Sequence, residues 1–228
     1  PSLGLLPPVK FLQIVEDVGL GPRLGEWVLR AACTQAKSWL AAGHTSIQLA
    51  VNLSDSQFHD GKLTDTVANV LAETKFPSEL LDFELTETIM FRSPEHAIAT
   101  LQSLRTLGVE LSLDDFGTGF YSLRHLQQYP LNSLKIDQSF IRNIAENERD
   151  AAITRMVIAM AHSLNLRTVA EGIETQEQLD FLRELGCEVV QGFILSQPLA
   201  VDLFLPFVAK HIATGAGRHF TSFRRFAL

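Results

Sequence analysis

Two adjacent aspartates, Asp114 and Asp115, end an apolar run and are followed at once by a stretch that contains Gly117 and Gly119. Successive residues of a regular strand point to opposite faces, so neighbouring carboxylates inside a strand cannot share one site. Glycine adopts backbone angles closed to other residues, and a glycine-rich loop could therefore let both carboxylates converge. Two like charges at short range repel unless something positive lies between them. The pair is a candidate cation site, although a lone Asp-Asp more often caps a turn.

Polar side chains also close the other apolar runs of the chain. Periodicity predicts six strands, at residues 47–54, 80–87, 109–115, 133–137, 167–174 and 188–193. Apart from the two aspartates, the polar residues near their carboxyl ends are Asn52, Glu84, Glu87, Lys135, Asp137, Glu171, Glu174 and Gln191. Functional groups of parallel α/β folds gather at the carboxyl ends of the strands. A helix cap explains one such residue, but six strands that all end this way indicate a shared site.

The elements that must position these residues alternate strands with helices. Helical patterns cover residues 25–43, 93–108, 150–164 and 175–186. Thr175 and Gln178 fit a capping box at the start of the last of these. The alternation predicts βαβ units, a parallel sheet and an α/β fold of the (β/α)8 TIM-like barrel type. A barrel of this type has eight strands, so about two are expected upstream of Pro1.

Composition narrows the class of protein. The chain has 228 residues, of which 46% are hydrophobic, and no apolar run long enough to span a membrane. Its start has no basic stretch ahead of an apolar core and so does not resemble a signal peptide. The pattern around Cys33 and Cys187 indicates buried, reduced cysteines, so we expect a cytoplasmic domain. The net charge of −7 argues against a surface that binds nucleic acid polymers.

The strand-end residues are rich in carboxylates and contain neither cysteine nor histidine. Hard oxygen ligands of this kind suit Mg²⁺ or Mn²⁺ and do not suit structural zinc. Adjacent carboxylates can bridge two cations about 4 Å apart, the arrangement used for in-line displacement at phosphorus. The sequence therefore favours a two-metal phosphoryl-transfer site.

Six segments carry a family resemblance. They are VNLSDSQF (51–58), FELTET (83–88), DDFGTGFYSL (114–123), LKIDQSFI (134–141), AEGIET (170–175) and GCEVVQGF (186–193). In this order they resemble the successive motifs of the EAL domain, and the match runs from about Leu5 to Phe204. The resemblance implies a (β/α)8 barrel that hydrolyses cyclic di-GMP to linear 5'-pGpG with two Mg²⁺ or Mn²⁺ ions.

The resemblance also implies roles for individual residues. Those matching metal ligands are Asn52, Glu84, Asp114, Asp115 and Glu171, with Asp114 bridging the two ions. Lys135 and Glu171 match catalytic groups, the lysine positioning the attacking water or a phosphate oxygen and the glutamate being the family's candidate base. Asp137, Glu174 and Gln191 match groups around the metals and the substrate. Glu87, Gly117 and Thr118 match the anchored loop that follows the aspartates.

The chain departs from the family pattern at two places. Tyr121 stands where the family usually has a small serine, in a loop associated with metal-site closure and dimer contacts. The Glu-x-Leu motif that names the family, with its metal-ligand glutamate, is expected just before Pro1, and turnover depends on it. We therefore expect residues 1–212 to be an N-terminally incomplete EAL barrel.

Residues 213–228 lie outside the resemblance and form a basic, aromatic tail. Phe220, Phe223 and Phe226 recur every third position among arginines, which predicts a short amphipathic helix. The family further implies a homodimer and attached sensory or GGDEF-type domains.

Three other functions fit parts of the pattern. A cyclic di-GMP receptor without turnover would usually show substitutions in the acidic set, which is retained here. An unrelated Mg²⁺-dependent barrel gives no reason for the glycine-rich loop. Lys135 as a Schiff-base lysine needs a lowered pKa, which nearby acids oppose. A metal-dependent phosphodiesterase fits the whole pattern best.

Overall fold

The structure, a computed structural model, describes residues 6–44, 47–91, 93–117, 126–213 and 225–227. The chain falls into two compact units, Pro1–Val109 with Phe226–Leu228, and Glu110–Arg225. Each unit pairs parallel strands with helices.

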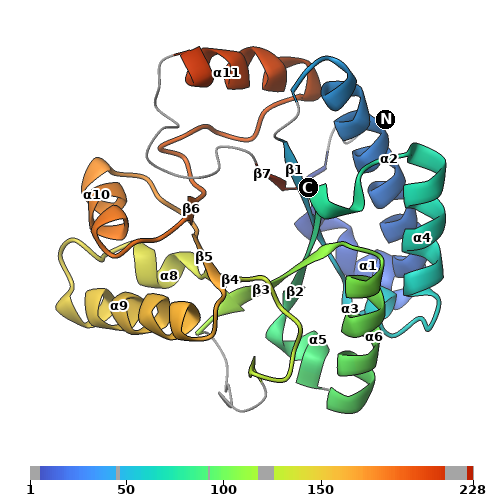
Figure 1. Cartoon of the computed structure of the whole chain (residues 1–228), viewed down its shortest axis with the longest axis horizontal. Coiled ribbons are helices and arrows are strands. Elements are labelled where there is room, and N and C mark those ends of the chain that lie inside the picture. The colour runs from blue at the N-terminus through green and yellow to red at the C-terminus, as the bar shows by residue number, and fades with distance from the viewer. Residues whose placement is uncertain (1–5, 45–46, 92, 118–125, 214–224, 228) are drawn as a thin grey trace. The chain divides into compact units, whose positions relative to one another are not determined.

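The first unit contains two central strands and the helices around them (Figure 1). Its elements are η1 (Pro8–Lys10), α1 (Leu12–Asp17), α2 (Gly21–Ala41), β1 (Gln48–Asn52), α3 (Asp55–Phe58), α4 (Leu63–Thr74), η2 (Ser78–Leu80), β2 (Leu81–Thr86), α5 (Glu87–Phe91) and α6 (Pro94–Thr106). Strands β1 and β2 pair in parallel, with Asn52 opposite Glu84 at their carboxyl ends. This register places two of the expected metal ligands side by side within the unit.

Helix α2 shows how the sequence pattern builds the first unit. Its buried side chains Leu29, Cys33, Ala36 and Trp39 recur every three or four residues and form one apolar face. This helix packs against α4, α3 and β1. The helix therefore covers the strand that carries Asn52.

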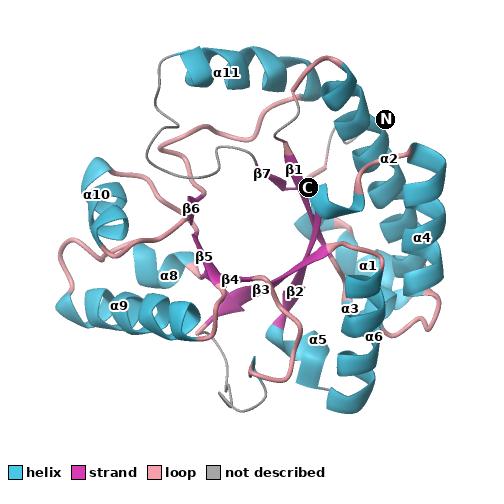
Figure 2. Ribbon diagram, viewed as in Figure 1, coloured by secondary structure: helices cyan, strands magenta, loops and turns pink. Residues whose placement is uncertain are grey.

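The second unit is a four-stranded parallel sheet with the strand order β6-β5-β4-β3. Its elements are β3 (Glu110–Phe116), β4 (Ser133–Ile136), α8 (Gln138–Ile141), α9 (Glu148–Ser163), β5 (Arg167–Ala170), α10 (Gln176–Glu184), β6 (Val189–Val190) and α11 (Val201–Ala213). Helices α8, α9 and α10 lie along one side of these strands (Figure 2). All carboxyl ends of the four strands thus point to the same edge, as the βαβ alternation predicts.

The strand predictions are confirmed in position and differ at their ends. The strand expected at 167–174 ends at Ala170, because Gly172 takes a φ of +70° and turns the chain. In the tail, where we expected an amphipathic helix, the described residues form β7 (Arg225–Ala227), which neighbours β1 in the sheet order. An edge strand offers unpaired backbone groups, and a short extended segment can satisfy them without an apolar helix face.

Within the described residues, no helix combines the length and the apolar character needed to cross a membrane.

Candidate metal centre

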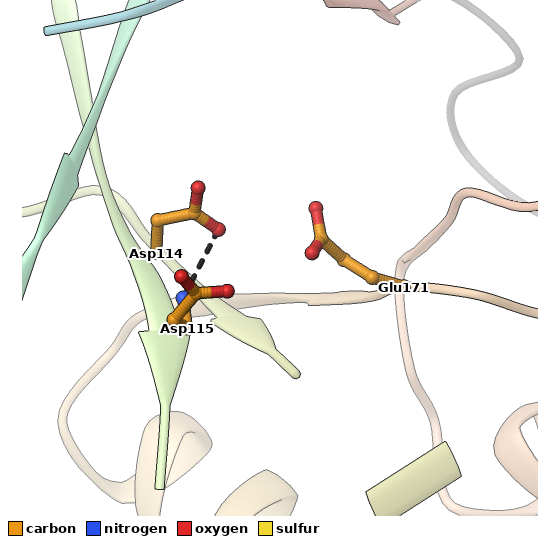
Figure 3. A group of neighbouring side chains, drawn as sticks. All are labelled: Asp114, Asp115 and Glu171. Atoms are coloured by element: carbon orange, nitrogen blue, oxygen red, sulfur yellow. Dashed lines mark hydrogen bonds between the residues drawn. The ribbon is translucent and has the colours of Figure 1, made fainter. Parts of the chain in front are cut away.

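Three carboxylates converge at the carboxyl edge of the second unit. Asp114 and Asp115 come from the end of β3, and Glu171 follows β5 directly. One oxygen from each lies within 4.8 Å of the others, and the three side chains point toward one another in Figure 3. Among the described residues, this is the group that the structure brings together with ligand spacing for a metal ion.

The two aspartates face the same point because strand β3 is bulged where they lie. In the register with β4, Leu113 pairs with Leu134 but Phe116 pairs with Ile136, so β3 holds one residue more than its partner. Asp115 occupies the left-handed region with a φ of +53°, and its backbone N–H donates to Asp114 Oδ1 at 3.0 Å. The sequence suggested that glycines release the aspartates from strand alternation. The structure shows that Asp115 itself makes the turn.

Lys135 lies among these carboxylates. Its Nζ is 2.8 Å from Asp114 Oδ1 and 2.6 Å from Glu171 Oε1. The residue belongs to β4, between β3 and β5, and is only 2% exposed. A buried ammonium is stable when it is paired, and its two partners provide that pairing. The lysine therefore serves as an internal counter-charge for the cluster.

Electrostatics at Asp115 reflect the crowding of acids. Burial raises the pKa of Asp115, and the charges of Asp114 and Asp137 raise it further, while Lys135 partly opposes them. A side-chain hydrogen bond with Asp137 acts in the same direction as the acids. Asp137 also caps α8, since its Oδ1 accepts from Ser139 N at 2.9 Å. The region favours positive charge, as a cation site must.

Gly117 follows the bulge and is closely packed. Its φ is +102°, and a Cβ built on it would lie 2.6 Å from the ring of Phe140 on α8. Any larger residue would therefore strain the backbone and displace Phe140. Thr118, Gly119 and Tyr121 lie outside the described residues.

The backbone after Glu171 is held by the segment that follows β6. Ile173 N donates to Gln191 O at 3.1 Å, and Ile194 N donates to Ile173 O at 3.0 Å. A Cβ on Gly192 would lie 2.2 Å from Ile173 O, so this approach requires glycine. The Gln-Gly pair of the sequence thus has a packing reason, which local patterns did not reveal.

The remaining expected site residues divide by unit. In the first unit, Glu84 is 1% exposed while its register partner Asn52 is exposed. Glu87 begins α5 and is buried, and this burial raises its pKa. In the second unit, Glu174 and Gln191 are exposed near the carboxyl edge.

The donor set of the cluster fits a hard divalent cation. Asp114, Asp115 and Glu171 offer carboxylate oxygens, which are the ligands that Mg²⁺ and Mn²⁺ prefer. Sequence reasoning found all three but missed Phe140, whose ring packs closely against Gly117 after β3. This contact has no local signal in the sequence, since it joins residues 23 positions apart.

Comparisons with known proteins identify the family. The family model described as the EAL domain matches residues 1–198. The chain belongs to the EAL domain family. Solved EAL domains are TIM-like barrels, so the expected α/β fold class is confirmed.

Two curated relatives with this EAL domain come from Pseudomonas aeruginosa. The bifunctional diguanylate cyclase/cyclic di-GMP phosphodiesterase MucR is 42% identical over 209 residues, which are 92% of this chain and 30% of MucR. The cyclic di-GMP phosphodiesterase NbdA is 44% identical over 211 residues, which are 92% of this chain and 27% of NbdA. The chain thus spans less than a third of either relative.

A solved EAL structure is similar over nearly the whole chain. The PaMucR phosphodiesterase in its c-di-GMP complex has a TM-score of 0.85 and 42% sequence identity. The alignment covers 90% of this chain and 83% of that chain.

Proposed function

We propose that this EAL domain is a phosphodiesterase that hydrolyses cyclic di-GMP to linear 5'-pGpG with two Mg²⁺ or Mn²⁺ ions. The observation that carries the proposal is the convergence of Asp114, Asp115 and Glu171 on one point beside Lys135. The family supplies the substrate class, because MucR and NbdA are named as cyclic di-GMP phosphodiesterases.

The proposed metal ligands come from β1 and β2 in the first unit, and from β3 and the residue after β5 in the second. They are Asn52, Glu84, Asp114, Asp115 and Glu171. When bound, divalent cations would neutralise the charge of the phosphodiester and acidify a water molecule. The bulge in β3 supports this assignment, because it presents two consecutive carboxylates to one point.

Lys135 has a separate role in the proposal. Its ammonium bonds to Asp114 and Glu171, and we propose that it positions the attacking water or a phosphate oxygen. Glu171 is the proposed base. Because both side chains are held by neighbouring strands, they reach the reaction already oriented.

Other residues would bind substrate or anchor the site. Asp137, Glu174 and Gln191 are proposed to contact the nucleotide or the metal-bound water network. Glu87, Gly117 and Thr118 are proposed to anchor the loop after β3, and the close packing of Gly117 on Phe140 supports this for the glycine.

The cellular setting belongs to the same proposal. We place the domain in the cytoplasm, as a homodimer attached to sensory or GGDEF-type domains. The support is that MucR combines a diguanylate cyclase with the phosphodiesterase, and that the chain covers 30% of MucR.

The test is a turnover assay on the full-length protein. Cyclic di-GMP is incubated with Mg²⁺ or Mn²⁺, and cyclic and linear dinucleotides are separated by chromatography. We expect linear product that disappears on chelation and returns when metal is restored. Bound nucleotide with no product under any metal would overturn the proposal and make the domain a receptor.

A further inference from the structure

Gln178 is a buried polar side chain that lies outside the acidic cluster. It belongs to α10 and is 5% exposed. Its Oε1 accepts from the backbone N–H groups of Glu174 and Thr175, at 2.8 and 3.1 Å. Its Nε2 donates to the carbonyl of Arg142 at 3.0 Å, 36 positions away. One side chain therefore joins two separate parts of the second unit.

The first two bonds are local: the one from Thr175 N belongs to the capping box at the start of α10, and the one from Glu174 N comes from the residue before it. The third bond is different, because Arg142 is the C-cap of α8. Helix α8 follows β4, which carries Lys135, and the loop before α10 follows β5 and carries Glu171. Gln178 is thus bonded both to the loop that follows β5 and to the end of α8, which follows β4.

Helix α8 also meets the Glu171 loop directly. Gly172 has a φ of +70°, and a Cβ built on it would lie 2.6 Å from Cβ of Gln138, the first residue of α8. The loop rests on one end of α8 at Gln138 and is bonded to the other end at Arg142. Two contacts at opposite ends fix its position better than either alone.

The chain contains a second capping box that shows what capping alone requires. At α3, Ser54 and Gln57 make the same reciprocal pair of bonds, with Ser54 N donating to Gln57 Oε1 at 3.1 Å. Within the described residues, the side chain of Gln57 bonds to the backbone N–H of Ser54, which is the bond of the box itself. Glutamate serves in a capping box as well as glutamine does. Only the bond to Arg142 O needs the amide donor of Gln178.

We propose that Gln178 is a positioning residue, which holds the Glu171 loop against α8 and thereby sets metal loading at the cluster of Asp114, Asp115 and Glu171. This inference rests on the proposed function. Partners that orient metal ligands from outside the coordination shell typically change metal affinity by about 10- to 100-fold when they are lost.

The decisive variant is Gln178→Glu. Its carboxylate can still accept from the N–H groups of Glu174 and Thr175, but it cannot donate to Arg142 O. The matched control is Thr175→Ala, which removes the acceptor for Gln178 N and leaves the bond to Arg142 in place. Gln176→Ala, at an exposed position of the same helix, controls for changes to α10 that touch neither loop.

Three measurements separate positioning from stability. They are the metal concentration for half-maximal turnover, the thermal unfolding midpoint, and amide hydrogen exchange of residues 138–142. For Gln178→Glu we expect about a tenfold higher metal requirement and faster exchange in α8. For Thr175→Ala we expect a lower unfolding midpoint with an unchanged metal requirement and unchanged exchange in α8. Equal metal requirements in the two variants would overturn the proposal.

Hydrogen exchange tests positioning by Gln178 independently of whether the protein is a phosphodiesterase. If the wild-type protein gives no linear product, the proposed function fails. Faster exchange of residues 138–142 in Gln178→Glu, with a weaker Mn²⁺ affinity by calorimetry, would still support positioning by Gln178. Exchange at the wild-type rate would overturn it, whether or not the protein is an enzyme.

Discussion

Lys135 Nζ lies 2.6 Å from Glu171 Oε1, and the pairing of β4 with β5 fixes this contact. The backbone N–H of Glu171 donates to the carbonyl of Ile136, the residue after Lys135, at 3.2 Å. The strand ladder therefore continues one residue past β5, and Glu171 lies two positions beyond Val169, the register partner of Lys135. Residues two apart in a strand share a face, so Glu171 lies on the face that carries Lys135. An ion pair on such a rigid base needs little side-chain rearrangement to form.

Replacement of Lys135 by methionine should destabilise the metal-free protein and abolish turnover. The change leaves Asp114 and Glu171 without their shared cation. We expect a loss of about 2 kcal/mol in the free energy of unfolding, less than for a fully buried pair because Glu171 keeps some exposure. Chemical denaturation with and without Mn²⁺ measures it, and added metal should recover more stability in the variant than in the wild type. Lys210→Met, on the exposed side of α11, is the control. Equal metal effects in all three proteins would contradict the counter-charge assignment.

Asp114→Asn should leave a folded domain without turnover. The amide keeps the size of the side chain but loses the negative charge that a metal ligand needs. We expect product formation to fall by roughly a hundredfold or more, as for the loss of one preorganised electrostatic group. Chromatographic product assays test this, with circular dichroism to show that the fold is intact. Asp202→Asn changes an exposed acid of α11 and should leave the rate unchanged. Full activity of the Asp114 variant would rule out its role as a ligand.

Gly117→Ala should cost more stability than Gly43→Ala, although both glycines have a positive φ. Gly43, with a φ of +94°, has no atom within 4 Å of a built Cβ, whereas Gly117 meets the Phe140 ring. We expect Gly43→Ala to lower the free energy of unfolding by about 1 kcal/mol through backbone strain. Gly117→Ala should lower it by at least about 2 kcal/mol more, because overpacking against Phe140 adds to the strain. Urea denaturation compares the two. Adding Phe140→Leu to Gly117→Ala should recover the steric part, and a lack of recovery would show that the ring is not the obstacle.

Glu188→Gln should lower stability at pH 7 and have little effect in acid. Burial alone would raise the pKa of Glu188, but hydrogen bonds from Thr168 and His162 outweigh it and lower the pKa. A lowered pKa means that the unfolded chain binds the proton more readily, so the stabilisation is present above the ordinary value of 4.5 and is lost as the pH falls below it. We expect a difference of about 1 kcal/mol at pH 7, because Glu188 is only partly buried. Denaturation curves at pH 7 and pH 4 measure it. A difference that persists unchanged at pH 4 would contradict the role of the charge.

The sequence predicts the strands and the acidic residues because both depend on local patterns. All six expected strands occur, and the residues that converge in the second unit were named from their positions at strand ends. The bulge at Asp115 was not predicted, since a non-glycine residue in the left-handed region depends on its tertiary contacts. The capping box of Gln178 was predicted from Thr175, but its bond to Arg142 was not, because the partner is a backbone carbonyl far along the chain.

The counter-charge of Lys135 has a consequence for how the domain is made and kept. A cluster of acids that needed ions in order to fold would tie the protein's production to the metal supply of the cell. Here Lys135 supplies a positive charge from the chain itself, so we expect the domain to fold in metal-depleted medium. We also expect ion binding to be a later step that chelation reverses without unfolding the domain.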